Sequence, residues 1–436
     1  MKESKDMNFE VLKKSNLKRN ILIAIVVVAI ISAIVLNFTQ AKYRTTQSIP
    51  LIQGTINYAP YDYKTVAMYV DGEPVDTLPE GKYELTSESY CTNEDNAKDE
   101  SITLSYDTDT QGLLITPMNK KGTKCYLYFE EQLCPEGAIA CNTIIAASKP
   151  QGETTDWTGQ TTYYYTGNPN NWVQFGTNSS GQSLYWRIIR INGDGTIRMI
   201  YQGTGFNTSG TNTQIGTSAF NSSYNNNMYV GFKYTSNQVH GTGTNSTILN
   251  TLNDWYSKNL VDEAEYLDGN AGFCGDRIPS TSSSSSNGSG GTGTTITYYG
   301  AYIRLYNKGT SNSNPSLQCD SQDVYTTTDS SSGNKSLQYP IGLVTADEAA
   351  LTGITWNNAN TGSYLYIGQD YWTMTPSNFH SASSRVIVFI VYDGGNLYRN
   401  IVNLARGVRP VINLRSDVSL SGSGTTSAPF KVVGAS

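Results

Sequence analysis

The residues with the most chemical potential in this sequence are six cysteines and two histidines. No cysteines have the CxxC spacing typical of metal or redox sites, and His240 and His380 are far apart in the chain. We therefore predict no metal site and no cofactor. An even number of cysteines is typical of disulfides in an oxidising compartment. Because each pair falls within one proposed structural unit, we expect the pairs Cys91–Cys125, Cys134–Cys141 and Cys274–Cys319.

Acid–base and phosphate chemistry find little support in the sequence. Ser/His/Asp catalysis would need His240 or His380, but Ser, Thr and Gly surround both, so we predict two surface histidines and no enzyme. The glycine-rich residues 280–295 lack the strand-to-helix context and the lysine of a phosphate loop, which predicts a flexible loop instead. Residues 192–195 resemble part of a calcium loop, but the later ligands are missing and a turn is expected.

A recognition surface is better supported, in residues 371–414. From 377 to 406 the sequence mixes apolar residues with Tyr, Ser, Gly and Asn, which make adaptable binding surfaces. We expect a hairpin that Phe389, Val391, Leu397 and Val402 hold to the core, with the side chains between them facing outward. The predicted ligand-binding residues are Trp372, Phe379, His380, Ser381, Ser383, Ser384, Arg385, Ile387, Tyr392, Asp393, Tyr398, Arg399, Ile401, Leu404 and Arg406.

The composition predicts a large β-rich protein. The chain has 436 residues, with 40 Gly, 31 Tyr and only 15% charged residues, so it can form more than one domain with a core. Its net charge of −6 and the lack of a basic stripe make nucleic acid an unlikely partner.

The N-terminus predicts export. Residues 1–20 form a basic tail and residues 21–38 an apolar run that is just long enough for a transmembrane helix. This arrangement predicts a single-pass cell-surface protein with a cytoplasmic N-terminus. The alternative is a cleaved signal peptide, because residues 39–41 offer a cleavage site, and the protein would then be secreted.

Composition shifts and turn signals divide the remaining chain. The expected parts are a stalk (39–62), a small all-β sandwich (63–131), a disulfide loop and linker (132–160), a ligand-binding domain (161–416) and a β-hairpin tail (417–436). In the ligand-binding domain we expect a hairpin at 185–204, a helix from Ser246, and a helix with a capping box of Thr345 and Glu348 that ends at Gly353. Residues 298–307 are expected to form a buried strand.

The element order and two motifs resemble a known fold. The phrase YWTMTP at 371–376 before a glycine-flanked hairpin, and the closing GVRPVINL at 407–414, resemble the bacterial branch of the C-type-lectin-like fold. That branch includes formylglycine-generating enzymes, the variable proteins of diversity-generating retroelements, and surface proteins of gut Firmicutes. The resemblance implies an α+β fold: a C-type-lectin-like domain after the β-sandwich and the transmembrane helix. It also implies that the first and last strands of the domain pair and that the late hairpin lies on an exposed face.

The resemblance has two implications for function. The enzyme branch needs a cysteine pair near the C-terminus, but no cysteine follows Cys319, so an oxidase is only the third choice. Retroelement mutagenesis of Asn codons never yields Lys, Glu, Gln, Met or Trp, and residues 377–406 contain none of these five. The expected variable positions are the predicted ligand-binding residues other than Trp372 and Phe379. An ordinary polar hairpin is the alternative.

Together these patterns predict an exported bacterial surface protein, adhesin or receptor-like, that binds an extracellular protein or glycan. The other class of function is a structural envelope or stalk component without a dedicated ligand. The position of four aromatic residues separates the two: exposure of Trp372, Phe379, Tyr392 and Tyr398 on one face favours binding, and their burial favours a structural role.

Overall fold

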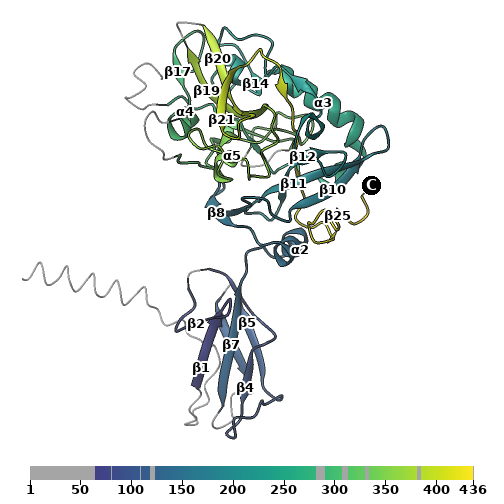
Figure 1. Cartoon of the computed structure of the whole chain (residues 1–436). Coiled ribbons are helices and arrows are strands. Elements are labelled where there is room, and N and C mark those ends of the chain that lie inside the picture. The colour runs from purple at the N-terminus through teal and green to yellow at the C-terminus, as the bar shows by residue number, and fades with distance from the viewer. Residues whose placement is uncertain are drawn as a thin grey trace, which may run out of the picture. The chain divides into compact units, whose positions relative to one another are not determined.

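The computed structural model describes residues 64–79, 81–108, 110–117, 123–280, 290–306, 313–328, 333–380 and 384–435. The chain divides into two compact units, Met1–Leu133 and Cys134–Ser436. Each unit has its own sheets and its own hydrophobic core (Figure 1).

The first unit is a small β-structure around the strand β7. Its sheet has the order β2-β1-β7-β3, β4 also pairs with β7, and β5 and β6 form a separate hairpin. Along β7 every second side chain is buried, and Leu127 and Phe129 pack in one core with Leu113 and Ile115 of β6. The strands are β1 (Lys64–Val70), β2 (Glu73–Val75), β3 (Tyr83–Leu85), β4 (Tyr90–Thr92), β5 (Thr103–Asp107), β6 (Gly112–Thr116) and β7 (Lys124–Glu131).

One sheet of the second unit is built on the hairpin of β11 and β12. Its order is β23-β12-β11-β10-β25-β24, with β9 on β11 and β8 on β9. The hairpin turn lies at Asn192 to Gly195, as the sequence predicts, and Gly195 has a φ of +79°. The strands are β8 (Gly152–Thr155), β9 (Thr161–Tyr164), β10 (Trp172–Thr177), β11 (Ser183–Ile191), β12 (Ile197–Gly203), β23 (Val411–Leu414), β24 (Leu420–Ser421) and β25 (Phe430–Val432).

The other sheet of the second unit carries the late hairpin. Its order is β13-β22-β19-β20-β21, with β17 on β19, so β21 lies at an edge of this described sheet. The strands are β13 (Thr217–Ser218), β17 (Thr297–Tyr298), β19 (Tyr371–His380), β20 (Arg385–Val391), β21 (Leu397–Ile401) and β22 (Arg406–Gly407). Two short ladders add β14 (Lys233–Tyr234) with β15 (Thr244–Asn245) and β16 (Phe273–Cys274) with β18 (Val324–Tyr325).

Short helices connect these strands. The α-helices are α2 (Ile139–Ala147), α3 (Thr247–Asn259), α4 (Gly300–Leu305) and α5 (Ala346–Leu351), and the 3-10 helices are η1 (Thr211–Thr213), η2 (Asn227–Val230), η3 (Val261–Tyr266) and η4 (Ser321–Asp323). Both predicted helices are confirmed. Ser246 caps α3 by accepting a hydrogen bond from the backbone N–H of Leu249, and Thr345 and Glu348 form the expected capping box of α5.

The three disulfides are those predicted from the sequence: Cys91–Cys125, Cys134–Cys141 and Cys274–Cys319. The first joins directly opposite residues of β4 and β7. Three disulfides fit an extracellular or otherwise oxidising compartment.

The expected opening strand of the ligand-binding domain, at the start of the hairpin 185–204, is β11, and the expected closing strand is β23. These two strands are not neighbours. The closing strand β23 pairs with β12, with Ile412 opposite Met199, and β12 in turn pairs with β11. The two ends of this region therefore lie in one sheet, but one strand apart. Residues 298–307 were expected to form a buried strand; instead they contain the end of β17 and all of α4.

The prediction of a membrane anchor has to be corrected. The described residues include no helix with the length and apolar character needed to cross a bilayer. The longest described α-helix, α3, has 13 residues, whereas a span needs about 20. The predicted basic tail (1–20), transmembrane helix (21–38) and stalk (39–62) lie outside the described residues. The described residues form a mostly β fold with short helices, which fits the α+β expectation in part, and they give no support to a single-pass surface location.

Candidate functional site

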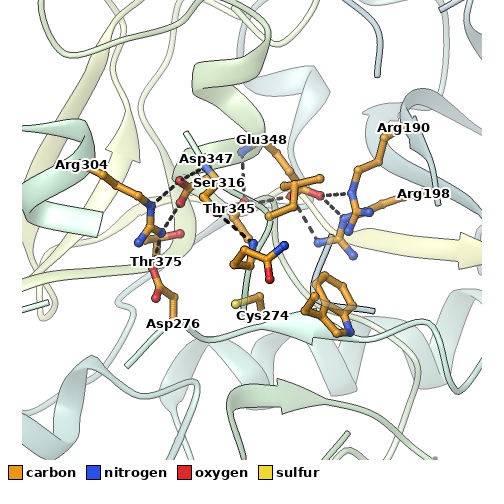
Figure 2. Close-up of a pocket in the computed structure, with 13 residues that line it drawn as sticks. Arg190, Arg198, Cys274, Asp276, Arg304, Ser316, Thr345, Asp347, Glu348 and Thr375 are labelled. Atoms are coloured by element: carbon orange, nitrogen blue, oxygen red, sulfur yellow. Dashed lines mark hydrogen bonds and ion pairs between the residues drawn. The ribbon is translucent and has the colours of Figure 1, made fainter. Parts of the chain in front are cut away.

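A buried ion network connects α5 to the first sheet of the second unit (Figure 2). The Glu348 carboxylate lies 2.8 Å from Arg190 Nε and 2.5 Å from Arg198 Nε, and all three side chains are almost completely buried. Burial alone would raise the pKa of Glu348, but Arg198 and Arg190 outweigh this effect and lower it to about 2. The carboxylate also accepts a hydrogen bond from the backbone N–H of Thr345. Glu348 therefore completes the capping box of α5 and also holds two arginines.

A second ion group lies beside the first. Arg304 of α4 donates from Nε and Nη2 to the two carboxylate oxygens of Asp347, both at 2.7 Å, and its Nη2 also pairs with Asp276. Burial raises the pKa of Asp276 to about 6, although Arg304 works against this shift. Figure 2 shows Arg304 lying between the two acids.

The pocket between these two groups is too small for a substrate. Its volume of about 10 Å³, counted as the space open to the centre of a water molecule, is enough for roughly one water. Its wall includes Cys274, which belongs to a disulfide, and Thr375. Glu348, Asp347 and Asp276 are all paired with arginines. These charges hold α4 and α5 in place, and the pocket does not have the room for catalysis.

His240 is not the free surface histidine that was expected. Its side chain is only 24% exposed, and Nδ1 lies 3.0 Å from Asp323 Oδ1, while Arg277 Nε lies 2.7 Å from the same oxygen. The interaction with Asp323 raises the pKa of His240. His380, at the end of β19, is exposed.

Two residues predicted to contact a ligand belong to the core instead. Trp372 and Phe379 are buried, and Trp372 Nε1 donates to the backbone oxygen of Ser218 at 2.9 Å. The reason is the position of β19: it is a central strand, and His380 is its only exposed residue. A central strand packed on both faces buries its side chains on both sides.

The other predicted residues that the structure describes are exposed or half-buried. Exposed residues are His380, Ser384, Arg385, Tyr392, Asp393, Tyr398 and Leu404, and half-buried ones are Ile387, Arg399, Ile401 and Arg406. Ser381 and Ser383 lie outside the described residues. The residues expected to hold the hairpin, Phe389, Val391, Leu397 and Val402, are all buried. None of the expected variable positions that the structure describes is buried.

Arg399 lies among aromatic rings from two other parts of the chain. Its guanidinium carbon is 5.0 Å from the ring centre of Tyr302, 3.9 Å from that of Tyr306 and 5.0 Å from that of Trp356. Trp356 stacks on Tyr398 with 5.2 Å between ring centres and 11° between planes. Tyr298 and Tyr392 extend the set at its two ends. We call these six rings the aromatic row: Tyr298, Tyr302, Tyr306, Trp356, Tyr398 and Tyr392.

Backbone contacts position the row around β19 to β21. Tyr298 in β17 lies opposite Asn378 in β19, and α4 follows directly with Tyr302 on its surface. The loop after α5 bonds to the late hairpin through the N–H of Leu397, which donates to the backbone oxygen of Thr355 at 3.1 Å. This bond holds Trp356 beside β21.

The polar contacts of Arg399 are incomplete. Its Nη1 donates to Asn378 Oδ1 at 3.0 Å, but its Nε is buried without a hydrogen-bond partner. No ion pair joins Arg399 to a carboxylate among the residues that the structure describes. The aromatic row therefore surrounds a positive charge whose hydrogen bonding is only partly satisfied.

The sequence analysis found Tyr392, Tyr398 and Arg399 but missed the four rings outside the late hairpin. A signal was present: Tyr298, Tyr302 and Tyr306 are spaced four residues apart, the period of one helix face. Trp356 lies in a loop and no local pattern indicates its role.

Comparisons with known proteins found no relative: no protein-family model, no curated protein and no solved structure matches this chain. The function must therefore be argued from the geometry. Ring faces and a guanidinium provide contact area, a positive charge and hydrogen-bond donors, which suit binding.

Proposed function

We propose that the protein is a ligand-binding protein of an extracellular or otherwise oxidising compartment, and that it recognises its ligand through the aromatic row and Arg399. The observation that carries the proposal is a continuous row of six rings, three of which surround Arg399, with Tyr392 38% and Tyr398 46% exposed. Tyr, Trp and Arg are the side chains that contribute most to the binding energy of protein interfaces.

The way the row is supported favours recognition. Phe389 and Leu397, in the two strands of the late hairpin, are fully buried and anchor the hairpin in the core. The rings of the row therefore pack against a rigid element. A rigid surface loses little conformational entropy on binding, and tyrosine contributes a large contact area with few rotatable bonds. The proposed ligand is extracellular, since the disulfides fit that compartment.

Diversification of this surface is a further part of the proposal. Eleven of the expected variable positions are described and none is buried, so they could change without disturbing the core. The DNA tests this part: a near-repeat of the segment for 377–406, beside a reverse transcriptase gene and differing at adenines, is the expected result. A locus without such a repeat contradicts diversification and leaves the binding proposal intact.

A structural role is the second candidate, and one observation favours it. Trp372 and Phe379, two of the four aromatic residues proposed to separate binding from structure, are fully buried. If the whole late hairpin served only to complete the fold, the rings of the row would act as cover for the core and would contact no partner.

The test is binding by the full chain and by a variant in which Trp356→Ala is combined with Tyr398→Ala. Both proteins are applied to an array of extracellular proteins and glycans, with Phe206→Ala as the matched control because Phe206 is 42% exposed and lies outside the row. We expect the wild type to bind a limited set of array members and the double variant to lose at least tenfold in affinity, since hot-spot truncations cost about 2 kcal/mol or more. Equal binding by the double variant, or none by the wild type, contradicts the proposal.

A further inference from the structure

The arginines of the second unit differ in how their charge is used. Arg190, Arg198 and Arg304 are paired with carboxylates inside the fold. Arg409 has no carboxylate in the described structure, but it donates from all three of its side-chain nitrogens, to Tyr201, Leu365 and Gln202. Arg399 has neither arrangement: one nitrogen donates to Asn378, the Tyr302 hydroxyl also interacts with the side chain, no carboxylate of the described chain pairs with it, and three rings surround its guanidinium.

We propose that the ligand of the aromatic row is a segment of a protein that presents an aspartate or glutamate, and that this carboxylate pairs with Arg399. The inference rests on the proposed function and adds the chemistry of the ligand. A carboxylate accepts charge-assisted hydrogen bonds from a guanidinium, and the planar guanidinium of arginine matches its geometry better than a lysine ammonium does. The surrounding rings keep water from one side of the pair, which strengthens it.

The charge of the late hairpin complements an acidic partner. The chain as a whole has a net charge of −6, but residues 377–406 contain three arginines and a single acidic residue, Asp393. Of these arginines, Arg406 is paired with Asp370 at 3.0 Å, whereas Arg385 is exposed and Arg399 lies in the row. A basic surface favours partners of opposite charge.

The aliphatic residues beside the row favour a protein over a sugar. Ile387 and Ile401 are directly opposite each other on β20 and β21 and are half-buried, and Leu404 is 39% exposed. Aliphatic side chains next to Tyr, Trp and Arg are typical of the centre of a protein interface. A glycan, which presents mostly hydroxyl groups, would leave these aliphatic groups in contact with polar atoms.

The experiment selects peptides from a random phage-displayed library on the full chain. The wild type, Arg399→Gln, Arg399→Lys and the double variant Trp356→Ala/Tyr398→Ala are used in parallel, with Arg415→Gln as the control because Arg415 is paired with Asp417 outside the row. We expect peptides selected on the wild type and the control to be enriched in Asp and Glu next to apolar residues. Arg399→Gln should lose the acidic enrichment but still select peptides, and Arg399→Lys should keep part of it, since it keeps the charge and loses the planar fork.

Synthetic copies of the selected peptides give the affinities. Replacing the acidic residue by Asn or Gln should weaken binding to the wild type by about tenfold to a hundredfold, the usual effect of losing a charge-assisted hydrogen bond, and should have little effect on Arg399→Gln. Binding that depends on Trp356 and Tyr398 but shows no acidic preference overturns the inference and leaves the proposed function standing. Retention of uronic-acid oligosaccharides without any peptide selection overturns the protein partner. If the wild type selects no peptide and retains no oligosaccharide, both proposals are overturned.

Discussion

Two regions of the second unit combine arginine with aromatic rings, and they use the combination differently. In the buried network, Arg190 lies over Trp157 and Arg198 over Phe273, and both pair with Glu348. In the aromatic row, Arg399 lies over three rings and no carboxylate of the described chain pairs with it. Both regions place guanidinium groups over rings, but they differ in burial and in whether a carboxylate pairs with the arginine. Glu348 supplies the negative charge for Arg190 and Arg198, and these arginines hold elements of the fold together. Arg409 has no carboxylate either, but neutral oxygens accept from all three of its nitrogens, so the incomplete set of acceptors at Arg399 is the basis for the proposed partner.

The energetic consequences should differ in the same way. A charge in the protein interior is costly unless it is paired, so removing one member of a buried pair leaves an uncompensated charge. A charge on a half-exposed side chain keeps contact with water, and its loss costs little in stability. The three predictions below test this contrast through stability, from the largest expected effect to the smallest.

Glu348→Gln should destabilise the second unit by about 3 to 5 kcal/mol, because it leaves Arg190 and Arg198 buried without a counter-charge. The measurement is urea unfolding followed by tryptophan fluorescence. All six tryptophans lie in Cys134–Ser436, so this signal reports on the second unit alone. Glu265→Gln, at an exposed position, is the matched control and should change stability by less than about 0.5 kcal/mol. A cost below about 1 kcal/mol for Glu348→Gln would show that the network is not structural.

Asp276→Asn should remove part of the pH dependence of stability. Burial raises the folded pKa of Asp276 from 3.8 to about 6, so the folded state holds a proton that the unfolded chain has already released. Stability from this group is fully present below about pH 4 and is lost as the pH rises through 6, by up to about 3 kcal/mol. We expect the wild type to lose more stability than Asp276→Asn between pH 4.5 and 7.5. Parallel pH curves for the two proteins would be the contradicting result. His240, whose folded pKa is also raised, is present in both and cancels in the comparison.

Local patterns predicted much of the fold, and the α5 capping box shows where they stop. Thr345 and Glu348 are three residues apart, so the cap can be read from the sequence. The arginines that pair with Glu348 lie 150 or more positions away, and no local pattern connects them to it. The error at Trp372 has the same origin: the sequence indicates a strand, but only the sheet order shows that β19 is central and buried on both faces.

The candidate site was half predictable for a similar reason. Alternation along β20 and β21 indicates which side chains face outward, because a strand reverses its side chains at every residue. Tyr398 and Arg399 were both among the predicted residues, but they are adjacent in β21 and alternation alone would place only one of them outward. The spacing of Tyr298, Tyr302 and Tyr306 would have indicated a helix face, but the high β-propensity of the tyrosines in 298–307 favoured a strand. Trp356 is brought to the site by hydrogen bonds between its loop and the late hairpin, which only the folded structure reveals.

The smallest expected effect is on the row itself, in a double-mutant cycle of Trp356→Ala and Tyr398→Ala. Both rings are partly exposed and they stack on each other, so each single change should cost about 1 kcal/mol or less, with a coupling energy of about 0.5 to 1 kcal/mol. Urea unfolding again measures the cost, since five tryptophans remain after Trp356 is replaced. Phe389→Ala is the contrasting change. Phe389 in β20 is fully buried in the core, and its truncation should cost about 3 to 5 kcal/mol. If either row variant cost as much as Phe389→Ala, the row would belong to the core, and the distinction between an arginine that holds the fold and one kept for a partner would fail.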